Sequence, residues 1–209
     1  MISYTTSDIE SWERLYRTNF INCLTGFKSV SLIGSVNELG QTNLAIFSSI
    51  MHIGSNPPLV GYISRPPKTI LHTLSNIKAT GVYTINHIHP AFLKQAHQTS
   101  ARYEAGISEF DEVGLTPEFH ENISAPFVKE SCIKYALSLQ EIIPIALNDT
   151  FLVIGKVMSI QIEQDIVSAD GFLHLDKVYS VCGNGIDGYY QTHLLDRFQH
   201  SKPDIPTQN

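Results

Sequence analysis

Three polar side chains that flank a double proline are the residues best suited to chemistry. Arg65, Lys68 and Thr69 lie where a strand ends and a helix over residues 68–77 is expected to begin. A helix N-terminus attracts anions through its free N–H groups and its dipole. Arginine can grip phosphate oxygens with two hydrogen bonds, lysine adds a point charge, and threonine donates from its hydroxyl. The segment therefore predicts a phosphate site, with a solvated basic pair beside a helix cap as the alternative.

Two further groups of residues are weaker candidates. Ser48 and Ser49 place hydroxyls at the end of an otherwise apolar strand, where serines usually satisfy local backbone groups. His87 and His89 are two residues apart and could face one side of a strand, and with His97 they could imitate a metal site. The strand ends nearby and no carboxylate stands at a convincing ligand spacing, so we predict no metal site.

Nucleophilic catalysis has no support in the sequence. The Gly-x-Ser-x-Gly turn of the serine hydrolases is absent. Cys23, Cys132 and Cys182 are widely spaced, form no CxxC pair and have no evident histidine partner. We expect each cysteine to behave as a small buried hydrophobe, and we name no catalytic residue.

The elements that must position these residues are mostly strands. Apolar and β-branched runs predict strands over 30–36, 42–53, 59–64, 82–88, 127–141, 151–167 and 178–182, with short helices over 9–17, 68–77 and 91–99. A polar loop is expected over 100–124. Many strands with few helices favour an all-β fold in which a closed barrel carries helical insertions. We expect a single domain over residues 1–209, with 202–209 as a flexible tail.

The composition excludes several classes of protein. The chain has 209 residues, of which 43% are hydrophobic and 16% charged, as expected for a globular protein with one buried core. The net charge of -6 argues against a nucleic-acid partner, which requires a basic face. The apolar stretches are too short to span a bilayer, and the N-terminal residues do not have the pattern of a secretory signal. We therefore expect a cytoplasmic protein that binds neither nucleic acid nor membrane.

The order of these pieces resembles the flavin reductase-like, FMN-binding split β-barrel family. The matching segments are the strand over 43–49, the Asn-Pro-Pro-Leu-Val turn and strand over 56–60, the helix start over 65–69, the strand over 80–86, and the paired segments 96–101 and 108–115. The resemblance continues more weakly from Ala125-Pro126 to the Gly-Lys-Val of residues 155–157. It covers roughly residues 20 to 160, and its specificity lies in the ordered set rather than in any one motif.

The resemblance implies an FMN-binding split barrel, an antiparallel Greek-key barrel, and a role for each matching residue. In this reading Phe47, Ser48, Ser49 and Ile50 line the isoalloxazine ring, largely through backbone groups, and Arg65, Lys68 and Thr69 hold the FMN phosphate. His97, Ser100, Ala101 and Phe110 would lie near the flavin. The resemblance also implies a homodimer with the flavin near the subunit interface.

The resemblance leaves three functions open. The first is an NAD(P)H-dependent flavin reductase, in which hydride passes from NADH or NADPH to flavin N5. The second is a non-enzymatic electron carrier or flavin-storage protein that binds FMN. The third is a flavin-dependent oxidoreductase that acts on another small molecule. The segment over 187–200 shows no clear nicotinamide-binding signature, so the sequence does not name the electron donor.

Overall fold

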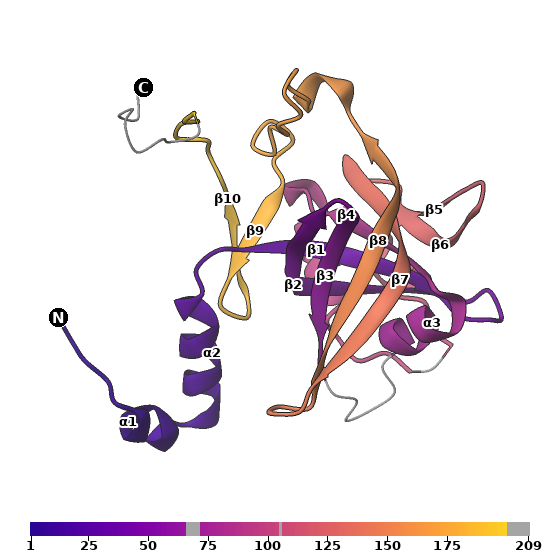
Figure 1. Cartoon of the computed structure of the whole chain (residues 1–209). Helices are drawn as coiled ribbons and strands as arrows, with labels where there is room; N and C mark the ends of the chain where they lie inside the picture. The colour runs from indigo at the N-terminus through magenta and orange to yellow at the C-terminus, as the bar shows by residue number, and fades with distance from the viewer. Residues whose placement is uncertain (66–71, 105, 200–209) are drawn as a thin grey trace.

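A closed antiparallel barrel forms the main body of the computed structural model, which describes residues 1–65, 72–104 and 106–199 (Figure 1). Six strands close the barrel in the order β1 (Lys28–Val36), β2 (Thr42–Ser55), β3 (Pro58–Ser64), β8 (Thr150–Ile162), β7 (Ile133–Ile145) and β4 (Val82–His87), which pairs again with β1. The all-β barrel with helical insertions that the sequence predicts is confirmed.

The hairpin of β1 and β2 shows how the local sequence builds this barrel. The Asn37 side-chain oxygen accepts hydrogen bonds from the backbone N–H groups of Leu39 and Gln41, each at 2.9 Å. Gly40 takes a φ of 80°, which glycine adopts without steric cost. The turn thereby fixes the register, in which Val36 faces Thr42 and Ile33 faces Ala45.

Two large apolar clusters, with two smaller ones, fill the described part of the molecule. The first cluster fills the barrel with fully buried side chains from its strands and from one covering helix. They include Ile33, Tyr62, Ile77, Tyr83, Ile85, Leu137 and Val153. A second cluster joins Val30 of β1 and Leu44 of β2 to Phe92, Ala96 and Phe110. The second cluster therefore fixes three short helical elements against the first two strands of the barrel.

The helices cover particular parts of the barrel. Helix α3 (His72–Thr80) packs against β1 and β2 and buries Leu74 and Ile77. The 3₁₀ turn η1 (Pro90–Phe92), helix α4 (Leu93–Gln98) and helix α5 (Glu109–Val113) supply Phe92, Ala96 and Phe110. No helix in the described ranges is long and apolar enough to cross a membrane.

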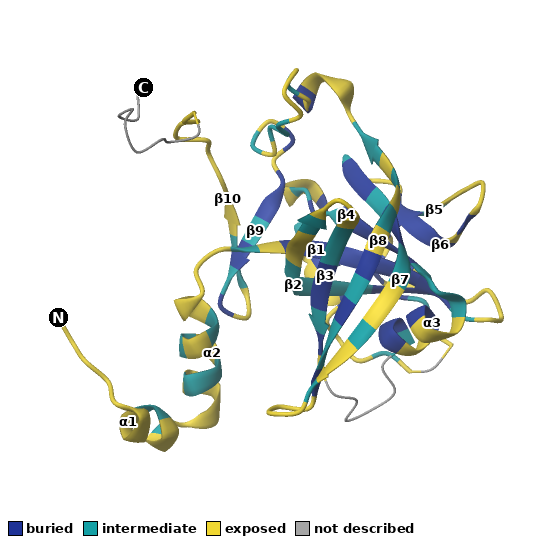
Figure 2. Ribbon diagram, viewed as in Figure 1, coloured by how far each residue is buried: buried dark blue, intermediate teal, exposed yellow. Residues whose placement is uncertain are grey.

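Smaller elements complete the chain. Strands β5 (Pro117–His120) and β6 (Ile123–Val128) form a two-stranded ribbon, and η2 (Gln164–Ile166) follows β8. Strands β9 (Val181–Asn184) and β10 (Gly188–Gln191) form a hairpin that joins the sheet where Lys28 faces Gly183. Helices α1 (Thr6–Ser11) and α2 (Arg14–Leu24) form an N-terminal arm that stands apart from β3, β7 and β8 (Figures 1 and 2).

The strand expected over 127–141 is interrupted at residues 129–132, between β6 and β7, and the strand expected over 151–167 ends at Ile162, before η2. Two further predictions of secondary structure are also wrong. The single helix expected over 9–17 is two helices, because Thr5 caps α1 and the Glu13 carboxylate caps α2 through the N–H groups of Leu15 and Tyr16. The expected loop over 100–124 contains α5 and β5. Short elements of four or five residues leave too brief a pattern to be distinguished from a polar loop.

Candidate functional site

An irregularity in β2 lies at the predicted flavin-binding serines. Phe47 faces Ser31 of β1 and Ile50 faces Ser29, so two residues of β2, Ser48 and Ser49, oppose one residue of β1. This is a β-bulge, which disrupts the ladder locally and redirects side chains. The Phe47 and Ile50 side chains both pack against the barrel interior. The bulge therefore leaves the backbone of residues 48 and 49 without register partners on β1.

The Ser49 hydroxyl forms two hydrogen bonds between the bulge of β2 and the neighbouring strand β3. It donates to the Ile63 carbonyl at 3.2 Å and accepts from the Ile63 N–H at 3.1 Å. These two hydrogen bonds join the bulge of β2 to the C-terminal end of β3, two residues before Arg65. Because the one proton of this hydroxyl is already donated to Ile63, the hydroxyl has none left to donate to a ligand beside the bulge.

Arg65 directly follows β3 and is exposed to solvent. It lies at the rim of the barrel, two residues along the chain from Ile63 of the Ser49–Ile63 contact. Lys68 and Thr69, the other residues predicted to hold a phosphate, lie outside the described residues. The described rim, with the β2 bulge near an exposed arginine, fits a ligand that carries a phosphate.

His97 is joined to the C-terminal hairpin. Its Nδ1 lies 2.6 Å from the Tyr189 hydroxyl, and the two rings meet edge to face at 5.6 Å between centroids. Burial and the nearby Asp187 raise the pKa of Tyr189. Ser100 and Ala101 follow in an exposed turn at the end of α4, where their N–H groups bond back to His97 and Gln98.

Phe110 occupies a different environment from the other predicted site residues. Its side chain has 0% exposed surface and packs in the cluster of Leu44, Phe92 and Ala96. Here it holds α5 and α4 against β2 and offers no surface to a ligand.

Sequence reasoning missed two residues of this region. Tyr189 is 92 positions from His97, and an aromatic residue in a short strand gives no signal of such a partner. Glu109 is buried and its carboxylate accepts a hydrogen bond from the Leu44 N–H at 3.0 Å. Burial raises the pKa of Glu109, although the Leu44 hydrogen bond opposes that shift. The carboxylate fastens α5 to β2 upstream of the bulge.

The remaining candidate histidines have separate partners. His87 Nδ1 lies 2.8 Å from the Ser180 hydroxyl, and burial lowers the pKa of His87 to about 4. The His89 ring accepts a hydrogen bond from the Ala91 N–H at the start of η1. Within the described ranges, no three His, Cys, Asp or Glu side chains gather as a metal site would require.

Comparisons with known proteins agree on the family. A sequence model of the flavin reductase-like domain matches residues 27–181. A crystal structure from Shewanella frigidimarina NCIMB 400, assigned as a flavin reductase with a split barrel domain, is 44% identical, with a TM-score of 0.93 over 96% of this chain and 100% of that one.

Two more distant structures share the fold. Nitrilotriacetate monooxygenase component B from Bacillus cereus is 21% identical, with a TM-score of 0.82 over 94% of this chain and 98% of that one. Flavoredoxin of Desulfovibrio vulgaris (Miyazaki F) is also 21% identical, with a TM-score of 0.71 over 87% and 93%. The family match extends over most of the barrel, and this chain therefore belongs to the flavin reductase-like family of split-barrel oxidoreductases.

Proposed function

We propose that this protein is a homodimeric, FMN-binding flavin reductase that takes hydride from NADH or NADPH. The observation that carries the proposal is the β2 bulge at Ser48 and Ser49, tied by hydrogen bonds to Ile63 and followed by the exposed Arg65. A bulge of this kind exposes backbone groups at the rim of a rigid barrel, where a cofactor ring can be held in a fixed orientation.

The residues divide into three groups around the proposed cofactor. The backbone at the bulge would meet the ring, while Phe47 and Ile50 support the bulge from the barrel interior. Arg65 would hold the phosphate, together with Lys68 and Thr69 as the sequence predicts. His97, oriented by the Tyr189 hydroxyl, would stand near the flavin with the turn that carries Ser100 and Ala101. Bound FMN would supply the redox chemistry, in which its N5 accepts the hydride.

A homodimer is part of this proposal. A flat, apolar flavin ring at the rim of a barrel leaves one face open to water, and a second subunit would shelter it. Light scattering at micromolar protein concentration should report twice the mass of the 23.3 kDa chain.

Two measurements test the proposed activity. The purified protein, titrated with FMN, should bind it, and mass spectrometry of the denatured complex should recover FMN. The complex should then oxidise NADH or NADPH in steady state, faster with added flavin. Failure to bind FMN contradicts the proposal entirely. Tight FMN binding without NADH or NADPH oxidation would indicate the electron carrier or flavin-storage protein instead.

A further inference from the structure

The N-terminal arm has an apolar face that stays largely exposed in the described part of the chain. Helix α2, described in full, has no buried residue, and Leu15 and Leu24 are each 66% exposed. Tyr16, Phe27 and Ile186 are exposed as well. Ile186 of the β9–β10 turn lines a groove with Leu15 and Tyr16, and Phe27 packs edge to face on Tyr190 of β10 at 4.8 Å between ring centroids. We call Leu15, Tyr16, Leu24, Phe27 and Ile186 the arm patch. Monomeric proteins rarely expose a contiguous apolar surface of this kind.

The arm is ordered by contacts of its own. Trp12 packs edge to face on Tyr4 at 5.0 Å and contacts Phe20 at 4.8 Å between ring centroids. The Lys28 ammonium donates to the Asn22 carbonyl at 2.8 Å, which ties the end of α2 to the start of β1. Between α2 and the β9–β10 turn lies a groove of about 440 Å³ whose walls include Leu15, Tyr16, Phe20 and Ile186. The arm patch is therefore a formed surface rather than a loose segment.

A second apolar face lies on the outside of the barrel. Met51 faces Gly61, Gly61 faces Ile154, and Ile143 faces Leu152, so these residues share one side of β2, β3, β8 and β7. Ile53 lies over Gly61 beside Leu152. Their neighbours Tyr62 and Val153 point the other way, into the core. We call Met51, Ile53, Ile143, Leu152 and Ile154 the sheet patch.

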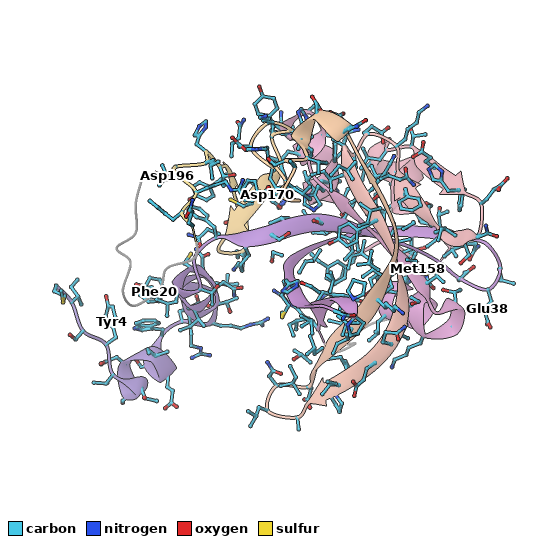
Figure 3. The ribbon with its side chains drawn as sticks, turned by 45° about the horizontal axis from the view of Figure 1, so that its top comes forward. Tyr4, Phe20, Glu38, Met158, Asp170 and Asp196 are labelled. Carbon is cyan, nitrogen blue, oxygen red and sulfur yellow. The ribbon has the colours of Figure 1, made fainter. Side chains whose placement is uncertain are left out.

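The two patches belong to one chain but do not meet. In Figure 1 the arm hangs beside the β9–β10 hairpin, away from β3, β7 and β8, and in Figure 3 Phe20 of the arm and Met158 of β8 lie far apart. The described helices α3, α4 and α5 pack on β1 and β2 and leave the sheet patch open. Met51, Ile53 and Ile143 are between 37% and 39% exposed.

We propose that two copies of this chain exchange their arms, so that the arm patch of each copy packs on the sheet patch of the other. The arm-patch residues are between 48% and 66% exposed, and three of the sheet patch are between 37% and 39% exposed. At roughly 150–250 Å² for a large side chain that is fully exposed, the two patches together offer about 800 Å² from each chain. A stable interface buries about 800 Å² per partner. Two identical arm-to-sheet contacts, related by a two-fold axis, therefore supply the area that a dimer needs.

The exchange would place the second copy beside the cofactor site. Met51 of the sheet patch directly follows Ile50 at the β2 bulge, and β3, which pairs with β2, carries the Ile63 contact of that bulge. The arm of one copy would then form a wall of the flavin site of the other. This inference rests on the homodimer of the proposed function and names the surfaces that make it.

Two double variants and their mixture test the exchange. The arm variant carries Leu15→Glu and Leu24→Glu, the sheet variant carries Met51→Glu and Ile143→Glu, and all four positions are exposed in the single chain. The control carries Leu39→Glu and Leu147→Glu, at turn residues that are 85% and 99% exposed. The dimer dissociation constant, measured by light scattering over a dilution series, should rise at least about 100-fold in both patch variants and stay unchanged in the control.

The mixture decides which surfaces meet. A heterodimer of the arm variant with the sheet variant keeps one intact arm-to-sheet contact, so mixing two monomeric variants should restore dimers. If arms paired with arms and sheets with sheets, neither contact would be intact and mixing would restore nothing, which overturns the exchange. A dimeric arm variant, a dimeric sheet variant or a monomeric wild type also overturns it. Failure of the wild-type dimer to bind FMN would contradict the proposed function alone.

Discussion

Strand β4 and helix α2 obtain their stability in different ways. In β4 the four residues from Tyr83 to Asn86 are buried, and the strand pairs with β1 on one side and β7 on the other. In α2, where the whole helix is described, no residue is buried. A helix of that length is marginal in water without tertiary packing. The barrel therefore stabilises itself, whereas the arm has most to gain from a surface outside its own chain.

The largest effect should come from the barrel interior. Ile85→Ala removes a side chain with 0% exposure and leaves a cavity, which should lower the free energy of unfolding by about 2–5 kcal/mol. Leu24→Ala in the arm should cost under about 0.5 kcal/mol at low protein concentration, because the side chain is exposed in the single chain. Urea denaturation compares the two, and equal losses would remove the distinction between barrel and arm.

Acid should weaken the barrel through His87. Burial lowers the pKa of His87 to about 4, so below pH of about 6.5 the unfolded chain binds a proton that the folded chain does not. The free energy of unfolding should therefore fall as pH drops from about 6.5 to 4, by about 3 kcal/mol from this group, and level off below.

His87→Gln isolates that contribution. The variant should lose this part of the pH dependence in urea denaturation between pH 7 and pH 4. His52→Gln, at an exposed position on β2, is the matched control and should keep the wild-type profile. An unchanged pH profile in His87→Gln would show that the loss of stability arises from other groups.

Substitutions at the rim of the barrel should change the affinity for flavin rather than the free energy of unfolding. Arg65→Ala and Lys68→Ala should each weaken FMN affinity roughly tenfold to hundredfold, because a charge-assisted hydrogen bond contributes about 1.5–3 kcal/mol and solvent reduces that figure. The affinity for riboflavin, which lacks the phosphate, should fall far less in these variants. Thr69→Ala should also weaken FMN affinity, by a smaller factor. Fluorescence titration with both flavins gives the two affinities.

The control for these variants is Lys129→Ala, at an exposed position just after β6. It should leave both flavin affinities unchanged. Equal losses for FMN and riboflavin in Arg65→Ala would indicate that the residue supports the fold of the rim. No loss for either flavin would make the pair a solvated surface cluster, and the phosphate would then be held elsewhere.

Most of the barrel could be predicted from the sequence because its strands are long and apolar. The strand expected over 30–36 is observed as Lys28–Val36, and the strand over 42–53 as Thr42–Ser55. The pairing of β4 with both β1 and β7 could not be predicted. It depends on contacts between distant residues, such as the hydrogen bond that the buried Asn86 side chain of β4 donates to the Leu32 carbonyl of β1, 54 positions away.

The candidate site, like the barrel, could be predicted only in part from local sequence patterns. The serines of β2 and Arg65 stand out in the sequence, and the structure ties Ser49 to Ile63, two residues before Arg65. The bulge itself depends on the register of β2 against β1, which no local pattern reveals. The arm is harder to predict, because a helix with apolar residues on one side predicts burial, and no residue of α2 is buried by the described part of the chain.

The smallest effect should come from the first turn of the arm. The Thr5 hydroxyl accepts a hydrogen bond from the Asp8 N–H at 3.3 Å, and the Asp8 carboxylate accepts one from the Thr5 N–H at 2.7 Å. Thr5→Ala should destabilise α1 by about 1 kcal/mol, since a helix loses roughly that much without its cap. Hydrogen exchange at the amides of α1 should then quicken about fivefold, while the urea midpoint of the barrel stays unchanged. Thr5→Ser keeps the hydroxyl and should exchange as the wild type does. A shift of the barrel midpoint in Thr5→Ala, absent in Thr5→Ser, would mean that the arm and the barrel unfold as one unit, and the arm would then not be a separate element held by a second copy.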